Sequence, residues 1–190
     1  MAEVRRQKKT RMNPAMGFLL FLAKLAAAVA AALFIILYCF WRVPVSGSSM
    51  EPAVQAGSTV FVNRLVYLFR NPERYDIAMF RDESGTVSVK RIIGLPGETV
   101  TISDTGEILI DGEEPEGMSD YVGTVNVAGR AGGSGVTLGD DEFFVIGDNP
   151  SRSQDSRSAS PGNVSGGELE GLAWLSVEWS GLPGFSWLVP

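Results

Sequence analysis

The sequence contains no histidine among its 190 residues. This absence excludes the Ser-His-Asp triad of many serine hydrolases and any zinc site that uses histidine ligands. Cys39 is the only cysteine, so no intramolecular disulfide can form. Lysine is scarce beyond residue 41, where Lys90 stands alone among nine arginines. A serine nucleophile in this region would need Lys90 as its base, unless the single lysine is an accident of a preference for arginine.

The charged residues are unevenly distributed along the chain. Residues 42–190 carry 10 basic and 21 acidic side chains, and this excess of negative charge argues against a nucleic-acid partner. By contrast, residues 1–16 are polar and basic, with five Lys or Arg residues against Glu3.

One long apolar run follows the basic segment. It extends from Phe18 to Phe40 and is interrupted only by Lys24. A helix of this length spans about 35 Å, enough to cross a bilayer core of about 30 Å. Lys24 lies near the basic end, where its side chain can reach the lipid headgroups. The run predicts one transmembrane helix.

The basic residues predict the orientation of this helix. Five of them precede it, which favours a cytoplasmic N-terminus and places residues 42–190 outside. A cleaved signal peptide is the alternative, with Ala28-Val29-Ala30 as a small-x-small site. Cleavage there would leave an apolar new terminus, so we favour an uncleaved anchor.

Short β-like runs bounded by turn-forming residues make up most of the remaining chain. The expected strands are residues 59–62, 76–80, 86–89, 99–102, 107–110 and 143–146, with a hairpin turn at 104–106. Strands at this spacing, with few helical stretches, predict a mainly β domain. Residues 111–139 are rich in Gly and acidic residues, a composition that indicates an insertion in the β domain. The aromatic residues near the C-terminus could pack under the core or lie at a membrane interface.

Ser49 lies in a turn just beyond the apolar run, in Ser46-Gly47-Ser48-Ser49-Met50-Glu51-Pro52. Gly47 permits close backbone approach and Pro52 stiffens the turn, so backbone N–H groups near the Ser49 hydroxyl could bind an oxyanion. A flexible linker beside the membrane has the same composition.

Lys90 follows the expected strand 86–89 and is predicted to lie at its end. To act as a base, its pKa must fall well below that of a free lysine, and burial among apolar neighbours would lower it. Its neighbours Val87, Val89, Ile92 and Ile93 have this character. A solvated lysine at a strand end is the alternative.

A third segment, residues 147–157, follows the apolar strand 143–146 and reads Gly-Asp-Asn-Pro-Ser-Arg-Ser-Gln-Asp-Ser-Arg. Such a loop can supply a hydroxyl to hold a lysine and an Asp–Arg pair to hold itself, although a capped surface turn has the same composition.

Together, S-M-x-P after the anchor, K-R-x-x-G-L-P-G and G-D-N-x₅-D-S-R resemble the bacterial type I signal peptidases, in family order and at fitting spacing. The resemblance covers residues 17–110 and 136–175 and is to the compact, single-anchor Gram-positive style. It implies a membrane-anchored serine endopeptidase with a Ser/Lys dyad on a mainly β fold, which removes signal peptides after small residues at positions −1 and −3.

The resemblance implies roles for twelve residues. Ser49 matches the nucleophile and Lys90 the general base, while Gly47 matches an oxyanion-hole position and Ser153 the serine that orients the lysine. The other matches are structural residues near the site and residues that bind substrate: Asp155 and Arg157 as an ion pair, Asp148 and Asn149 as loop anchors, Met50 and Val89 in the small-residue pocket, and Val45 and Ser88 with Val89 on strands that pair with the substrate.

The resemblance also implies the organisation of the whole chain. We expect a single-pass protein of the cell membrane, with an extracytoplasmic antiparallel β catalytic domain that carries a small inserted subdomain. The expected parts are a cytoplasmic tail, an anchor helix, a first catalytic part, an insertion, a second catalytic part and an aromatic tail: residues 1–16, 17–41, 42–110, 111–139, 140–175 and 176–190. The expected partners are preproteins and membrane lipid, with no obligate protein partner, and neither a metal nor an organic cofactor is required.

Three residues depart from the family pattern. Ala53 stands where Thr is usual, Tyr75 replaces a Gly in the segment Arg74-Tyr75-Asp76-Ile77, and Pro150 stands where Arg is commoner. None belongs to the dyad, so the departures bear on loop conformation. Two other interpretations of the function remain: an enzyme that processes a narrow set of substrate proteins, and a non-catalytic anchored β domain. A self-cleaving repressor also uses Ser/Lys chemistry, but the membrane helix and the lack of a DNA-binding segment make it remote.

Overall fold

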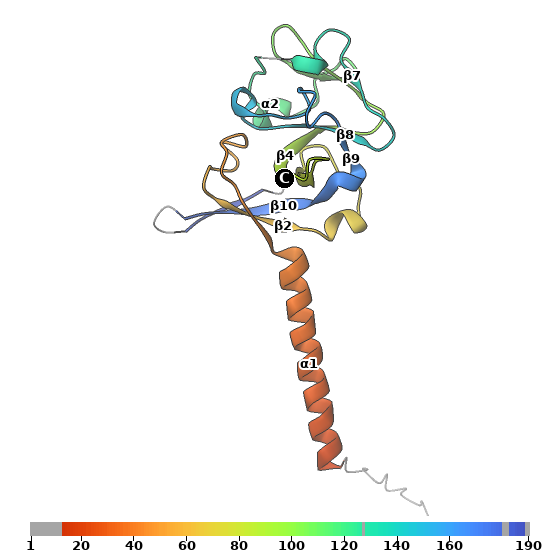
Figure 1. Cartoon of the computed structure of the whole chain (residues 1–190), viewed down its shortest axis with the longest axis vertical. Helices are drawn as coiled ribbons and strands as arrows, with labels where there is room; N and C mark the ends of the chain where they lie inside the picture. The colour runs from red at the N-terminus through yellow and green to blue at the C-terminus, as the bar shows by residue number, and fades with distance from the viewer. Residues whose placement is uncertain (1–12, 127, 180–182, 189–190) are drawn as a thin grey trace, which may run out of the picture. The chain divides into compact units, whose positions relative to one another are not determined.

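The computed structural model describes residues 13–126, 128–179 and 183–188, and the chain divides into two units, Met1–Leu37 and Tyr38–Pro190. Helix α1, Pro14–Cys39, makes up the described part of the first unit (Figure 1). It is long and apolar enough to cross a membrane. It starts three residues before the expected anchor, and the next element already begins at Trp41. The basic residues expected to set the orientation lie outside the described residues.

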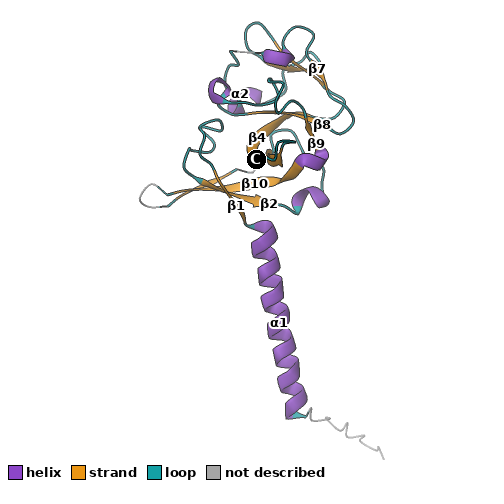
Figure 2. Ribbon diagram, viewed as in Figure 1, coloured by secondary structure: helices purple, strands orange, loops and turns teal. Residues whose placement is uncertain are grey.

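The second unit is built from two antiparallel sheets, which confirms the predicted mainly β fold (Figure 2). The larger sheet has the strand order β1-β2-β10-β3-β4-β8-β9, and β11 pairs with β10. Its strands are β1 Trp41–Pro44, β2 Thr59–Asn63, β3 Ile77–Arg81, β4 Val87–Gly94, β8 Glu142–Ile146, β9 Val164–Ser165, β10 Leu169–Glu178 and β11 Gly184–Trp187.

The smaller sheet has the order β6-β5-β7, with β5 Thr99–Ile102, β6 Ile108–Ile110 and β7 Val136–Thr137. Helix α2, Met118–Tyr121, packs with this sheet over one apolar cluster, to which Val100 and Met118 both belong. The boundary expected between residues 110 and 111 falls inside the sheet, because β5 pairs with β7 from beyond it. Short 3₁₀ helices are η1 Val66–Leu68, η2 Gly129–Ala131, η3 Pro150–Arg152 and η4 Gly166–Glu168.

Strand β10 is the longest strand described, and the sequence did not predict it. It pairs with β2 on one side and β3 on the other, and its register shifts between Ala173 and Leu175 and between Leu169 and Gly171. These irregularities remove the strict two-residue alternation that identifies a strand from sequence. Gly171 lies against the backbone of Asn63, where a side chain would not fit.

The turn that contains Ser49 is anchored by an apolar cluster. Met50 is 1% exposed and Val54 is fully buried, and both pack with Val60 of β2 and Met79 of β3. The backbone N–H of Val54 also donates to the Met50 carbonyl, at 2.8 Å. Burial of these two side chains therefore holds the turn beside β3 and β4, with Ser49 at the end of the anchored segment.

Candidate functional site

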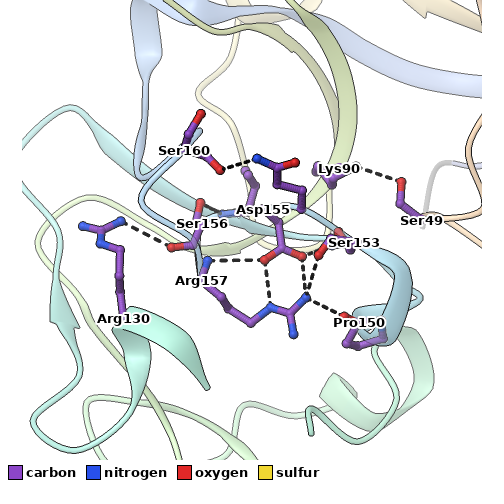
Figure 3. A network of polar contacts seen from close by, with 12 residues as sticks. Ser49, Lys90, Arg130, Pro150, Ser153, Asp155, Ser156, Arg157 and Ser160 are labelled. Atoms are coloured by element: carbon purple, nitrogen blue, oxygen red, sulfur yellow. Dashed lines mark hydrogen bonds and ion pairs between the residues drawn. The ribbon is translucent and has the colours of Figure 1, made fainter. Parts of the chain in front are cut away.

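Ser49 and Lys90 meet although 41 residues separate them in the chain (Figure 3). Lys90 lies inside β4, and its Nζ donates to Ser49 Oγ at 2.8 Å. The expectation that Lys90 lies at a strand end is wrong, because β4 continues to Gly94. Residues 91–94 pair with β8, a long-range contact that the local pattern does not contain.

Burial changes the acid–base character of Lys90. The residue is 6% exposed, and this desolvation lowers the pKa of its ammonium below the ordinary value. The nearby carboxylates of Asp155 and Asp148 oppose the shift, because negative charge favours the protonated amine. A lysine in this environment gives up its proton more readily than a solvated one and can act as a base.

Asn149 fixes the backbone that carries Ser49. Its N–H donates to the Ser49 carbonyl at 3.0 Å and its side-chain amide donates to the Ser48 carbonyl at 3.1 Å. Gly147, at the end of β8, lies so close to the Ser49 carbonyl and to Ser153 that a Cβ there would overlap both. The loop after β8 is therefore fitted against the backbone of the serine turn.

Asp155 and Arg157, expected as an ion pair, are almost fully buried. Arg157 Nε lies 2.8 Å from Asp155 Oδ1. The Arg157 guanidinium also donates to the carbonyls of Pro150 and Ser153, at 2.7 and 3.2 Å (Figure 3). Asp155 in turn accepts from the N–H of Gly147. The pair thus ties the loop to itself and to the end of β8.

Ser153 lies where the loop after β8 approaches the serine turn, and a Cβ at Gly147 would overlap its Oγ. Its Oγ is buried and makes no hydrogen bond within the part of the chain that the structure describes. Besides Ser49, Lys90 Nζ donates to the Val89 carbonyl, at 3.3 Å. The role of Ser153 in orienting the lysine stays a prediction.

Arg91 is a residue to which the sequence alone assigns no role. Side chains alternate along a strand, so Arg91 projects to the face opposite Lys90. There it forms a bidentate pair with Asp148, at 2.8 and 2.6 Å, and both side chains are buried. The adjacency of Lys and Arg in one strand was the available signal.

A small pocket of about 180 Å³ adjoins the dyad. It is lined by the segments Val43–Ser46 and Val87–Lys90 and by Gly47, Ser49 and Met50, and so includes the four expected substrate-binding residues, Val45, Met50, Ser88 and Val89. β1 pairs with β2 alone, and β4 pairs with β8 only from Arg91 onward. Both segments therefore present strand edges without a partner among the described residues.

The turn also leaves room for a developing oxyanion. A Cβ at Gly47 would meet no atom within 4 Å. The backbone N–H groups of Gly47 and Ser49 form no hydrogen bond with another backbone group in the described chain. Among the residues that the structure describes, no cluster of three or more His, Cys, Asp or Glu side chains could hold a metal ion.

The family model described as signal peptidase, peptidase S26, matches residues 19–179 of this chain. The chain belongs to the signal peptidase family. Signal peptidase I V of Bacillus subtilis strain 168 is 34% identical over 128 residues, which cover 62% of this chain and 74% of that one. Signal peptidase I of Bacillus amyloliquefaciens is 39% identical over 140 residues, 69% and 70% of the two chains.

A crystal structure of a signal peptidase I from Enterococcus faecalis V583 is also similar, with 29% identity and a TM-score of 0.41 over 54% of this chain and 97% of that one. The family model and the Bacillus relatives identify the chain as a serine protease of the signal peptidase I family, whose activity is removal of signal peptides from preproteins.

Proposed function

We propose that this signal peptidase cuts with a dyad of Ser49 as nucleophile and Lys90 as general base. The observation that carries the proposal is the 2.8 Å contact between Lys90 Nζ and Ser49 Oγ, made by a lysine that is 6% exposed. The neutral amine accepts the proton of the Ser49 hydroxyl as its oxygen attacks the scissile carbonyl. The lysine then donates this proton to the leaving amine, and water hydrolyses the serine ester.

Backbone groups stabilise the charge that develops on the substrate. The N–H of Ser49 and a second N–H near Gly47 donate to the oxyanion of the tetrahedral intermediate. Ser153, whose buried Oγ lies beside Gly147, orients the lysine when substrate is bound. Asp155 with Arg157 and Asp148 with Asn149 hold the loop that presents these groups.

The size of the pocket supports a preference for small residues at positions −1 and −3. Its volume of about 180 Å³ is bounded by the buried side chains of Met50 and Val89. An extended peptide that pairs with the open edges near Val45 and Ser88 would direct alternate side chains into this space.

Helix α1 anchors the enzyme, with the N-terminus in the cytoplasm and the catalytic unit on the outer face of the cell membrane. The functional divisions of the chain in this proposal are the tail, anchor, catalytic parts and insertion that the sequence predicts. Lipid contacts extend beyond the helix to exposed aromatic residues of the second unit. Phe40, the first residue after α1, contacts Trp174 at a centroid distance of 5.2 Å, and Trp174 packs on Trp187 at 5.7 Å.

The test is cleavage of a purified preprotein with an A-x-A site by the wild type and by Ser49→Ala, Lys90→Ala and Lys90→Arg. We expect only the wild type to cut after A-x-A, because each variant lacks either the nucleophile or a base that can lose its proton. Thermal unfolding of each variant serves as the folding control. Comparable cutting by Lys90→Arg would exclude Lys90 as the base.

A further inference from the structure

Tyr75 has a backbone conformation that a tyrosine rarely adopts. Its φ is +73°, in the left-handed region, where only one other non-glycine residue among those described, Asp111, is found. This conformation costs a bulky side chain free energy that glycine would avoid. The position is the one at which the family resemblance predicts glycine. A tyrosine stands here in spite of this cost, and its side chain makes two contacts.

The Tyr75 ring stacks on Tyr121, the last residue of α2, with centroids 4.6 Å apart and an interplanar angle of 28°. Its hydroxyl donates to the Glu116 carbonyl at 2.8 Å. Both contacts are to the insertion, residues 111–139. Tyr75 therefore connects the segment before β3 to residues of the insertion that lie more than 40 residues further along the chain.

Both tyrosines also hold Arg91. The Tyr75 carbonyl accepts from the Arg91 guanidinium at 2.8 Å, and that guanidinium lies 4.5 Å from the centre of the Tyr121 ring. An arginine over an aromatic face gains a cation–π interaction, which is stronger where water is excluded. Three groups thus fix the planar guanidinium: the Tyr75 carbonyl, the Tyr121 ring and the Asp148 carboxylate.

The chain of contacts ends at the serine turn. Asp148, held by Arg91, directly precedes Asn149, whose two nitrogens donate to the carbonyls of Ser48 and Ser49. We propose that the stacked rings of Tyr75 and Tyr121 position Arg91 and thereby hold the loop that fixes the catalytic serine. Resting on the proposed dyad, this assigns the insertion a positioning role in catalysis.

The first test compares Tyr121→Ala with Tyr121→Phe in preprotein cleavage by the full chain. Tyr121→Ala removes the ring over Arg91 and is expected to lower kcat about tenfold, because small displacements of catalytic groups are costly. KM should change less than about twofold, since substrate binds at the pocket near Val45. Tyr121→Phe keeps the ring and should restore kcat.

Val122→Ala is the matched control. Val122 directly follows Tyr121, is 5% exposed and packs in the apolar cluster of the smaller sheet. The Val122→Ala substitution loosens the packing of the insertion but leaves the Tyr121 ring over Arg91 in place. At equal folded fraction, Val122→Ala should keep the wild-type kcat. An equal loss of kcat in both alanine variants would overturn the proposal, because general loosening would then explain it.

A second readout does not require activity. Hydrogen exchange of the Asn149 amide, which donates to the Ser49 carbonyl, should be at least about threefold faster in Tyr121→Ala than in the wild type or in Tyr121→Phe. Unchanged exchange would overturn the positioning role even if no variant cleaved. If the wild type does not cut the preprotein but Asn149 amide exchange is faster in Tyr121→Ala, the result counts against the proposed function. The positioning role is then still supported.

Discussion

At the scale of single residues, the central feature is a lysine that is buried without a buried carboxylate as its direct partner among the described residues. Lys90 Nζ donates to a hydroxyl and a carbonyl, while the nearest carboxylates pair with arginines. If Asp148 or Asp155 contacted Lys90 directly, the ammonium form would be stabilised and the base lost. Under the proposed mechanism, Arg91 and Arg157 therefore keep the base available by pairing with those carboxylates.

This arrangement predicts how stability depends on pH. Burial lowers the pKa of Lys90 in the folded protein. Between this lowered pKa and the ordinary value of about 10.4, the unfolded chain holds a proton that the folded protein lacks, so wild-type stability rises with pH there. Lys90→Met has no such proton. Its Tm relative to wild type should be higher at pH 7 than at pH 10, as measured by calorimetry. A constant difference in Tm would contradict the lowered pKa.

Activity should follow the same group. Because neutral Lys90 is the proposed base, kcat/KM should rise with pH through the lowered pKa of Lys90. Cleavage of a peptide that spans an A-x-A site, measured from pH 6 to 10, gives the profile. A flat profile over this range would argue against a titrating lysine base.

At the scale of elements, one strand and one loop assemble the site. β4 directs Lys90 to one face and Arg91 to the other. The loop after β8 supplies Asp148, which pairs with Arg91, and Asp155, whose charge acts on Lys90. The approach of this loop to the serine turn depends on Gly147, where the backbone of Ser49 leaves no room for a Cβ.

Gly147→Ala should therefore displace the serine turn. We expect a destabilisation of about 1–3 kcal/mol from overpacking and a loss of kcat/KM of roughly a hundredfold from misplacement of Ser49. Gly139→Ala is the control, since a Cβ there meets its nearest neighbour, the side chain of Glu142, at 3.5 Å. Thermal unfolding and cleavage rates measure the two effects. Equal activity of both variants would mean that the fit at Gly147 does not matter.

At the scale of the whole molecule, the aromatic residues near the C-terminus form part of the surface. Trp179, Phe185 and Trp187 are 68, 66 and 73% exposed, on or beside the β10–β11 hairpin. A monomeric soluble domain rarely exposes so many large aromatic side chains together, whereas indole rings are favoured at membrane interfaces. This supports the proposed lipid contact.

The lipid contact can be measured with the full chain in vesicles. Lipids with brominated acyl chains quench nearby tryptophans, and we expect Trp187→Phe to lose part of the quenching seen in the wild type. Trp41, next to the anchor, and the exposed Trp179 provide the quenching that remains. If Trp187→Phe lowers total fluorescence but leaves the quenched fraction unchanged or larger, Trp187 does not lie in the lipid.

The features that depend on local pattern or composition could be predicted from the amino-acid sequence. A 23-residue apolar run is long enough to span a bilayer, the absence of histidine left Lys90 as the candidate base, and three short motifs identified the family. Most strands were also predicted, because their alternation and bounding turns are local. Only the tertiary structure decided the burial of Lys90, the pairing of Arg91 with Asp148, the course of β10 and the stack of Tyr75 on Tyr121. Each depends on residues far apart in the chain, whose contact sets the desolvation and the neighbouring charge that no local pattern records.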